Sequence, residues 1–196
     1  MCWILKPRSK KTDRYGADAP ETVILTEDEA WMYLQATTMR VWAACGQTPT
    51  VGVDPGRRKA GFYGTLNLHT GQEIVTRTAT FNAEVSAQHL QQILDTFPGV
   101  PILLFWDRAT WHRGPPIREL LASNPRLEII QYPVAAPDLN PQENVWKQTR
   151  QVISHNHLTA KLPDLADDFE DHLLSNTFES SFLDRYGYRL VCPFLN

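Results

Sequence analysis

Five consecutive apolar residues, Ile102–Trp106, constrain the fold more than any other stretch of this 196-residue chain. A continuous apolar run of this length is typical of a β-strand that is buried on both faces of a sheet. The run therefore predicts an α/β protein whose sheet is flanked by helices. Asp107 follows the run directly. Because ligand-binding groups of open α/β sheets gather at the carboxyl ends of strands, Asp107 is a candidate site residue.

Apolar and β-branched residues upstream of this run predict consecutive antiparallel strands. One strand is expected around Asp28, a second after a short turn, and a hairpin across the turn-forming residues 69–72. The four predicted strands span residues 23–34, 40–44, 59–68 and 73–81.

Helices and strands should alternate in the second half of the chain. Asn82 is placed to cap a helix that ends before Pro98, because apolar residues recur at the helical period between them. The remaining elements are expected at 117–121 (helix), 127–132 (strand), 142–154 (helix) and around Phe169 (a covering helix). The order β-β-β-α-β-α-β-α predicts a mixed sheet with three antiparallel strands, then βαβ crossovers, and helices on both faces. That order is found in the ribonuclease H-like fold.

Charge is distributed unevenly along the chain, whose formal net charge is −3. We expect a basic linker at residues 1–22, a ribonuclease H-like domain at 23–157 and an acidic extension at 158–196. No run of eighteen apolar residues or signal peptide is present, so we expect no membrane contact and a cytoplasmic location. Cys2, Cys45 and Cys192 form no CxxC pair, which indicates neither a disulfide framework nor a cysteine zinc site.

Three acidic residues on separate predicted elements form a candidate catalytic and metal site. Asp28 lies within a strand, Asp107 ends a strand, and Glu143 begins a helix. Two-metal phosphodiester cleavage needs carboxylates that converge from separate elements, and hard oxygen ligands select Mg²⁺ or Mn²⁺. Side chains alternate along a strand, so Asp28 points away from Glu27 and Glu29; we assign Asp28 to the site.

Several polar residues near these acids are candidate DNA contacts. Lys147 and Arg150 lie on the same helical face as Glu143, although a simple surface Glu-Lys pair is an alternative. Arginines are equally common as phosphate contacts and as solvated loop residues, and a lone histidine is more often structural. The complete set of candidates is Arg108, His112, Arg113, Asn140, Lys147 and Arg150.

A longer motif surrounds Glu143. Residues 132–147 read Tyr-Pro-Val-Ala-Ala-Pro-Asp-Leu-Asn-Pro-Gln-Glu-Asn-Val-Trp-Lys. This segment resembles the third-carboxylate motif of DDE-type insertion-sequence transposases of the Tc/mariner superfamily, P-x-x-S-P-x-L-N-P-I-E-x-x-W. Residues 106–112 resemble the second block, with a histidine five residues after Asp107, and residues 26–29 resemble the first, with Glu29 after Asp28. The matching positions of the third motif are Pro133, Pro137, Leu139, Asn140, Pro141, Glu143 and Trp146.

The resemblance implies a DNA transposase that uses two Mg²⁺ or Mn²⁺ ions to hydrolyse DNA at transposon ends and transfer strands, usually into TA dinucleotides. It also implies a homodimer or a partner transposase subunit, and activity at the bacterial nucleoid. Family members carry N-terminal helix-turn-helix domains; with 27 residues before Asp28, we expect this chain to be the catalytic half of a split or frameshifted gene, or a truncated copy. Arg108, Ala136 and Gln142 depart from the usual asparagine, serine and isoleucine.

Two alternatives remain open from the sequence. Residues 51–58 resemble the first-strand block of Holliday-junction resolvases, structure-specific nucleases of the same broad fold, which would make Asp54 the first carboxylate. Asp54 precedes Pro-Gly, however, and that order favours a turn. The second alternative is a transposase remnant that binds DNA or a partner without cutting; the presence of all three carboxylates disfavours it.

Overall fold

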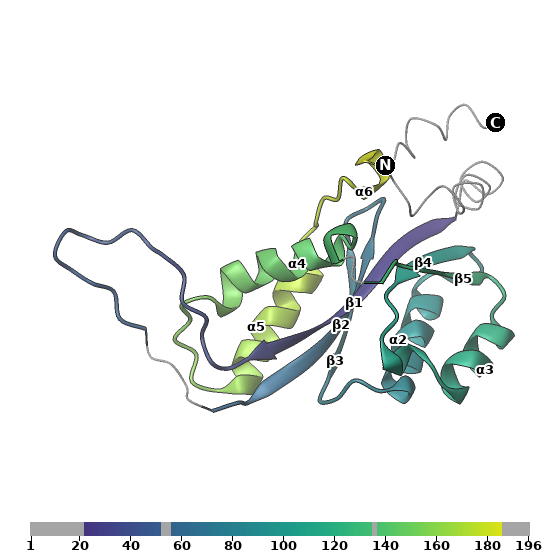
Figure 1. Ribbon diagram of the computed structural model, residues 1–196, viewed down its shortest axis with the longest axis horizontal. Helices are drawn as coiled ribbons and strands as arrows, with labels where there is room; N and C mark the ends of the chain where they lie inside the picture. Colours follow the sequence, from purple (N-terminus) through teal and green to yellow (C-terminus); the bar gives the residue numbers. More distant parts are fainter. Residues whose placement is uncertain (1–21, 52–55, 135–136, 186–196) are drawn as a thin grey trace.

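A five-stranded mixed sheet in the order β3-β2-β1-β4-β5 forms the centre of the protein (Figure 1). The computed structural model describes residues 22–51, 56–134 and 137–185. The strands β1, β2 and β3 are antiparallel neighbours, whereas β4 and β5 run parallel to β1. The strands are β1 (Val23–Tyr33), β2 (Lys59–Asn67), β3 (Glu73–Thr78), β4 (Ile102–Trp106) and β5 (Leu127–Gln131). The expected mixed sheet with three antiparallel strands is confirmed.

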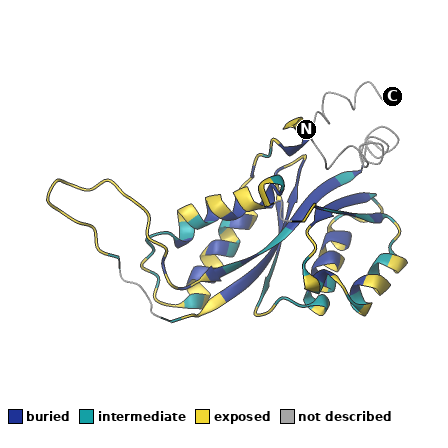
Figure 2. Ribbon diagram, viewed as in Figure 1, coloured by how far each residue is buried: buried dark blue, intermediate teal, exposed yellow. Residues whose placement is uncertain are grey.

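Helices cover both faces of this sheet, as expected (Figure 1). One apolar core lies between the sheet and α4 and α5, and a second lies between the sheet and α2 and α3. Buried residues follow these two layers in Figure 2. The helices are α2 (Ala83–Thr96), α3 (Pro115–Ser123), α4 (Gln142–Thr149), α5 (Leu162–Ser175) and α6 (Phe182–Arg185), with 3₁₀ turns at Thr110–His112 and Pro137–Leu139 and a π-helical turn at Arg150–Ser154.

Local sequence explains where α2 begins and ends. The Asn82 side chain accepts a hydrogen bond of 2.9 Å from the Val85 amide, which confirms Asn82 as the N-cap. At the other end, the Arg126 guanidinium donates to the carbonyls of Leu94 and Phe97, which the helix leaves without intrahelical partners. Arg126 therefore fixes α2 to the start of β5.

The predicted strand at residues 40–44 is wrong. These residues belong to an exposed arm, residues 37–51, that follows β1 and extends away from the sheet (Figure 1). The arm is attached at its base, where the Asn156 side chain bonds the backbone N–H and C=O of Met39. Apolar residues such as Val41 and Trp42 suggested a strand, but no neighbouring strand lies beside them among the described residues.

The acidic helix α5 completes one of the two cores. Leu165, Phe169 and Leu173 are buried against the sheet, and the Phe169 ring lies 4.9 Å from that of Phe62 on β2. Residues beyond the predicted boundary at 157 thus contribute to this core. No helix in the described ranges is long and apolar enough to span a bilayer.

Candidate active site

The register of β1 and β4 brings Asp28 and Asp107 side by side. These parallel strands pair Thr26 with Phe105, and two residues further along each strand come Asp28 and Asp107. Two residues are one full period of side-chain alternation, so both carboxylates point to the face that holds Phe105 and α4. Two acids from distant positions in the sequence thus come together at the carboxyl end of β4.

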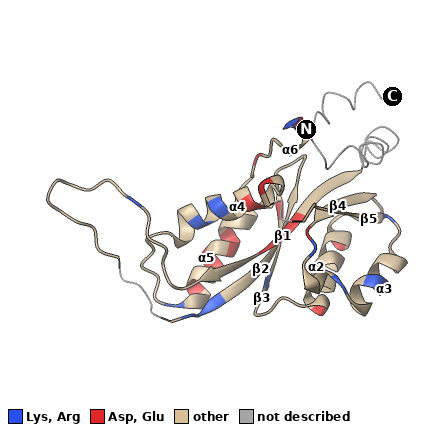
Figure 3. Cartoon of the chain, viewed as in Figure 1, with Lys and Arg blue, Asp and Glu red and all other residues tan. Residues whose placement is uncertain are grey.

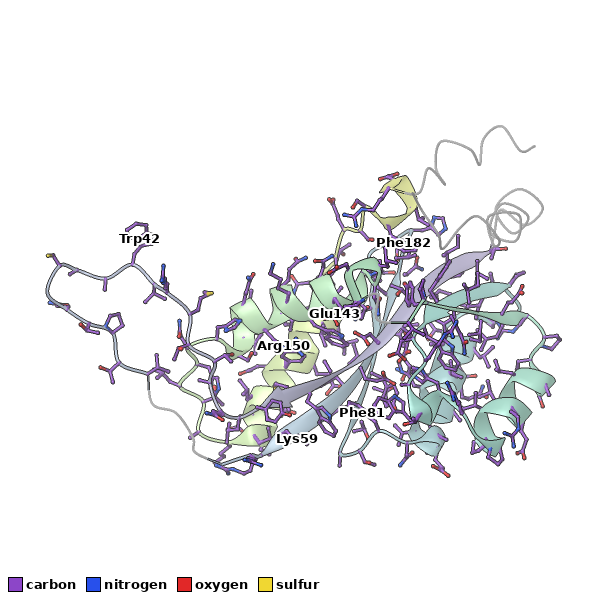
Figure 4. All side chains as sticks on the ribbon, in the orientation of Figure 1. Trp42, Lys59, Phe81, Glu143, Arg150 and Phe182 are labelled. Atoms are coloured by element: carbon purple, nitrogen blue, oxygen red, sulfur yellow. The ribbon has the colours of Figure 1, made fainter. Side chains whose placement is uncertain are left out.

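The loop before α4 is fastened to β1 by Asn140. Its side-chain oxygen accepts from the Thr26 hydroxyl at 2.7 Å and from the Gln142 amide at 3.1 Å, and its NH₂ group donates to the Glu27 carbonyl at 3.3 Å. These bonds fix the start of α4 beside β1. Glu143 is in the first turn of this helix and exposed, as Figure 4 shows.

Trp146 connects α4 directly to the first carboxylate. Its indole N–H donates to Oδ2 of Asp28 at 3.2 Å, and the ring is almost completely buried. Helix and sheet approach so closely here that a Cβ atom at Gly64 would lie 2.4 Å from the Trp146 ring. Gly64 is therefore required for this packing, and through it for the placement of Glu143 one turn before Trp146.

The three acidic side chains line one cavity of about 340 Å³. Arg108 and Asn140 line it as well, together with Tyr132 and the loop that follows it. The structure therefore brings Asp28, Asp107 and Glu143 together, as the sequence predicted. In contrast, Arg113 lines a different hollow, beside Trp106 and Ile117.

Burial and like charge disfavour ionisation of Asp28. Its pKa is raised to about 8, first because burial removes water from the carboxylate and then because the charges of Glu143, Glu29 and Asp107 repel it. The pKa of Asp107 is instead lowered, chiefly by the hydrogen bond from His112 and also by the amide of Ala109. One site thus holds one acid that resists ionisation and one that favours it.

The donor set of this cavity fits a hard divalent cation. Its candidate ligands are carboxylate oxygens, which Mg²⁺ and Mn²⁺ prefer. Oδ1 of Asp107 accepts a hydrogen bond from the Ala109 amide and also contacts Nδ1 of His112. A cation between the acids would offset the repulsion that raises the Asp28 pKa, so Asp28, Asp107 and Glu143 are the residues able to hold it.

A second group of titratable residues lies on the opposite face of β1. Glu27, Glu29 and His112 have side chains only 2–3% exposed. The imidazole contacts Oε1 of Glu29 at 2.8 Å, Oε2 of Glu27 at 3.5 Å and Oδ1 of Asp107 at 3.1 Å. Burial alone would lower the His112 pKa, but Glu27 and the hydrogen bonds to Asp107 and Glu29 outweigh it and raise this pKa to about 11. Burial also raises the pKa of Glu27 well above its ordinary value, with Glu29 adding to the effect.

Two of the expected DNA contacts have other partners in the structure. His112 is buried, its ring stacks on Trp106, and both its nitrogens face carboxylates. Asn140 is also buried, and both its side-chain oxygen and its NH₂ group form hydrogen bonds within the protein.

The basic candidates for DNA contact are more accessible. Arg108 and Lys147 are exposed, and Arg150 is partly exposed. Lys147 lies on α4 and Arg150 directly after this helix. Figure 3 shows basic positions along α4. Asp54, the alternative first carboxylate, lies outside the described residues.

The sequence interpretation missed a further buried carboxylate, that of Glu73. Glu73 on β3 accepts a hydrogen bond of 2.9 Å from the buried Gln142 side chain, and burial raises the Glu73 pKa to about 8 although this bond opposes the shift. The unusual glutamine in the third motif was the available signal, because a buried amide needs a polar partner. Nothing local to Glu73 identified it as that partner.

The comparisons with known proteins agree with this geometry. The model of the family described as DDE superfamily endonuclease matches residues 23–166. The chain belongs to this family. The DDE assignment drawn from the three sequence blocks is thereby confirmed.

One curated relative of this DDE-family chain is the insertion element IS630 uncharacterized 39 kDa protein of Shigella sonnei. The two are 25% identical over 150 residues, which cover 76% of this chain and 43% of the relative. The chain therefore spans less than half the length of this relative.

Solved structures of Mos1 transposase share the fold. The paired-end complex with left transposon end has a TM-score of 0.66 at 15% identity, covering 95% of this chain and 58% of that one. The catalytic domain of Mos1 mariner transposase has a TM-score of 0.60 at 13% identity, covering 95% and 87%. The expected ribonuclease H-like fold is confirmed.

Proposed function

We propose that this chain is the catalytic domain of a DNA transposase that hydrolyses phosphodiester bonds at transposon ends and then transfers strands to target DNA. The convergence of Asp28, Asp107 and Glu143 on one cavity carries this proposal. Membership of the DDE endonuclease family supports it. We propose TA dinucleotides as the target and the bacterial nucleoid as the place of action, on the resemblance to Tc/mariner transposases.

We assign Asp28 and Asp107 as the main cation ligands and Glu143 as the third. Mg²⁺ or Mn²⁺, two ions per site, would supply Lewis acidity to the attacking water and the leaving 3′ oxygen. The chain's own residues set the geometry. Trp146 orients Asp28, His112 and the Ala109 amide orient Asp107, and Asn140 fixes the helix that carries Glu143.

Exposed cations around the cavity are the proposed DNA contacts. Arg108 lines the cavity itself, where a guanidinium can pair with a phosphate that approaches the three acids. Lys147 on α4 and Arg150 directly after this helix would bind the DNA backbone further from the reacting bond. These contacts position DNA without reading its sequence.

We propose a second copy of this chain, or a partner transposase subunit, as the protein partner. The arm at residues 37–51 extends away from the sheet, and Trp42 on it is fully exposed (Figure 4). Val41 and Met39 beside Trp42 are also exposed. Neighbouring large apolar side chains in water favour a protein contact.

Cleavage of a labelled DNA duplex with Mg²⁺ or Mn²⁺ tests the catalytic proposal. We expect nicking by the unsubstituted chain, loss of nicking in Asp107→Ala, and retained nicking in Asp138→Asn, a control that removes an exposed acid outside the cavity. Binding without nicking, in both the unsubstituted chain and Asp107→Ala, would contradict the proposal and favour the non-cutting remnant.

A further inference from the structure

We propose that Glu27, Glu29 and His112 form a second metal site, separate from the cavity, that binds one Zn²⁺-like transition-metal ion. The site lies on the opposite face of β1 from Asp28. It goes beyond the proposed function and does not depend on it, because none of these residues lines the cavity among the described residues.

The ligand atoms are spaced as such an ion requires. One nitrogen of His112 and one oxygen from each glutamate lie within 4.8 Å of one another. Nε2 of His112 is 2.8 Å from Glu29 Oε1 and 3.5 Å from Glu27 Oε2. Ligands held about 2.0 to 2.1 Å from a tetrahedral Zn²⁺ stand about 3.3 Å apart. The two observed distances bracket this value, and the ligand oxygens of the two glutamates lie within 4.8 Å of each other, so small side-chain shifts would form the site.

Glu27 provides an independent reason for a ligand at this position. Its side chain is 2% exposed, and neither of its oxygens accepts a hydrogen bond from any of the described residues. A buried carboxylate without such bonds is costly and needs a partner, such as an ion. Its Oε2 lies 3.5 Å from Nε2 of His112, in an ion pair without a hydrogen bond, so this side chain is directed at the position of the proposed ion.

The residues around the cluster match the usual outer shell of a histidine metal site. Nδ1 of His112 is 3.1 Å from Oδ1 of Asp107, so a proton on Nδ1 would leave the Nε2 lone pair free for the ion. The Trp111 indole N–H donates to the liganding oxygen of Glu29. The Trp106 ring stacks on the imidazole at 4.2 Å and shields it. A bound ion would hold the His112 ring in place, and His112 would in turn hold the Asp107 carboxylate.

Charge and ligand type select the ion. Two ionised glutamates and one neutral imidazole balance a divalent cation within a buried space. A mixed nitrogen and oxygen donor set suits Zn²⁺ or Co²⁺, whereas Mg²⁺ takes oxygen ligands. The two faces of β1 are therefore expected to differ in the metal they prefer.

The zinc content of the purified full chain tests this assignment. The chain is loaded with Zn²⁺, desalted and analysed in an Asp28→Asn background, which weakens the cavity site. We expect about one zinc per chain, almost none after adding Glu27→Gln, and no change after adding Glu84→Gln, which alters an exposed acid elsewhere. The melting temperature should rise by about 5 to 10 °C at a zinc concentration one hundred times Kd, except in the Glu27→Gln protein. Equal zinc content with and without Glu27→Gln would overturn the assignment.

A measurement on the unsubstituted chain covers the case in which Glu27→Gln fails to fold. With Co²⁺ as the probe, a hyperfine-shifted exchangeable imidazole proton in the NMR spectrum, assigned to His112, would support the site. A Co²⁺ spectrum with only oxygen ligands would overturn it, and the cluster would then be held by a proton on His112.

Discussion

Adjacent residues of β1 lie in two different environments. Asp28 points to the side of α4, where it meets Asp107 and Glu143 in an open cavity. Glu27 and Glu29 point to the other side, where they enclose His112. In the cavity the charges repel one another, and Asp107 is about half exposed; behind the strand, a histidine sits among carboxylates that are almost completely buried.

This difference separates two kinds of acidic site. The cavity acids face an open space, whereas the buried cluster holds the protonated His112 whenever no metal is bound. The like charges in the cavity are unfavourable alone and become favourable when a metal cation binds between them. The buried cluster is already compensated in part by His112. Substitutions on the two faces should therefore affect different properties: DNA cleavage on the cavity side, and folding on the other.

The largest effect is expected in the cavity. Replacing Glu143 with Gln should lower the cleavage rate by at least about 10³-fold, or about 4 kcal/mol in the barrier, because one ligand charge is lost. The free energy of unfolding should change by less than about 1 kcal/mol, since Glu143 is exposed. Single-turnover cleavage and urea unfolding measure the two quantities, with Glu84→Gln as the exposed control. A Glu143→Gln protein that still cleaves would show that the third ligand is misassigned.

Behind the strand, His112→Ala should reduce stability by about 3 to 5 kcal/mol at pH 7, because Glu27 and Glu29 would be left buried without their cation. Urea unfolding of the His112→Ala and Asp28→Asn proteins measures and compares their stabilities. Asp28→Asn should not be destabilised, because it removes a carboxylate that burial and repulsion disfavour. Equal losses of stability in the two proteins would contradict the distinction between the faces.

Glu73 sharpens the comparison because its hydrogen-bond partner is the uncharged amide of Gln142. Its folded pKa of about 8 lies above the ordinary value of 4.5, so the folded state keeps a proton that the unfolded state releases. Stability from this group is thus present below about pH 4.5 and is lost as the pH rises toward 8. The Glu73→Gln protein should lack that loss and should be more stable at pH 8 by on the order of 3 kcal/mol. Urea unfolding at pH 5 and pH 8 tests this; parallel pH profiles of the two proteins would refute it.

The smallest effect concerns two arginines that lie on different sides of this region. Arg108 lines the cavity, whereas Arg113 faces the hollow beside Trp106. Arg108→Ala should weaken DNA binding by about 5-fold. It should also reduce the slope of log K against log salt concentration by about the amount of one phosphate contact. Arg113→Ala should change neither quantity in fluorescence anisotropy titrations at several salt concentrations. Equal weakening by both substitutions would mean that DNA also covers the second hollow.

The sequence was most informative where a local pattern determines position. The apolar run of β4 and the alternation along β1 were enough to place Asp107 and to choose Asp28 over Glu27 and Glu29. The covering helix near Phe169 was also expected, although its place in the core was not. These features depend on neighbours within one element.

Long-range pairing was not readable from the sequence. The bonds of Asn140 to Thr26, of Trp146 to Asp28 and of Gln142 to Glu73 join residues that are far apart in the chain. His112 was assigned to DNA because its partners on β1 could not be seen from residues 106–112. Residues 40–44 of the arm were predicted to form a strand because an exposed apolar segment and a buried strand can have the same composition.

Manganese soaked into crystals of the full chain tests most directly which side of β1 is built for a hard cation. We predict anomalous scattering in the cavity, within about 2.3 Å of carboxylate oxygens of Asp28 and Asp107, and its loss in the Asp28→Asn protein. Manganese bound only among Glu27, Glu29 and His112, with none between the cavity acids, would contradict the assignment of this cavity as the catalytic centre.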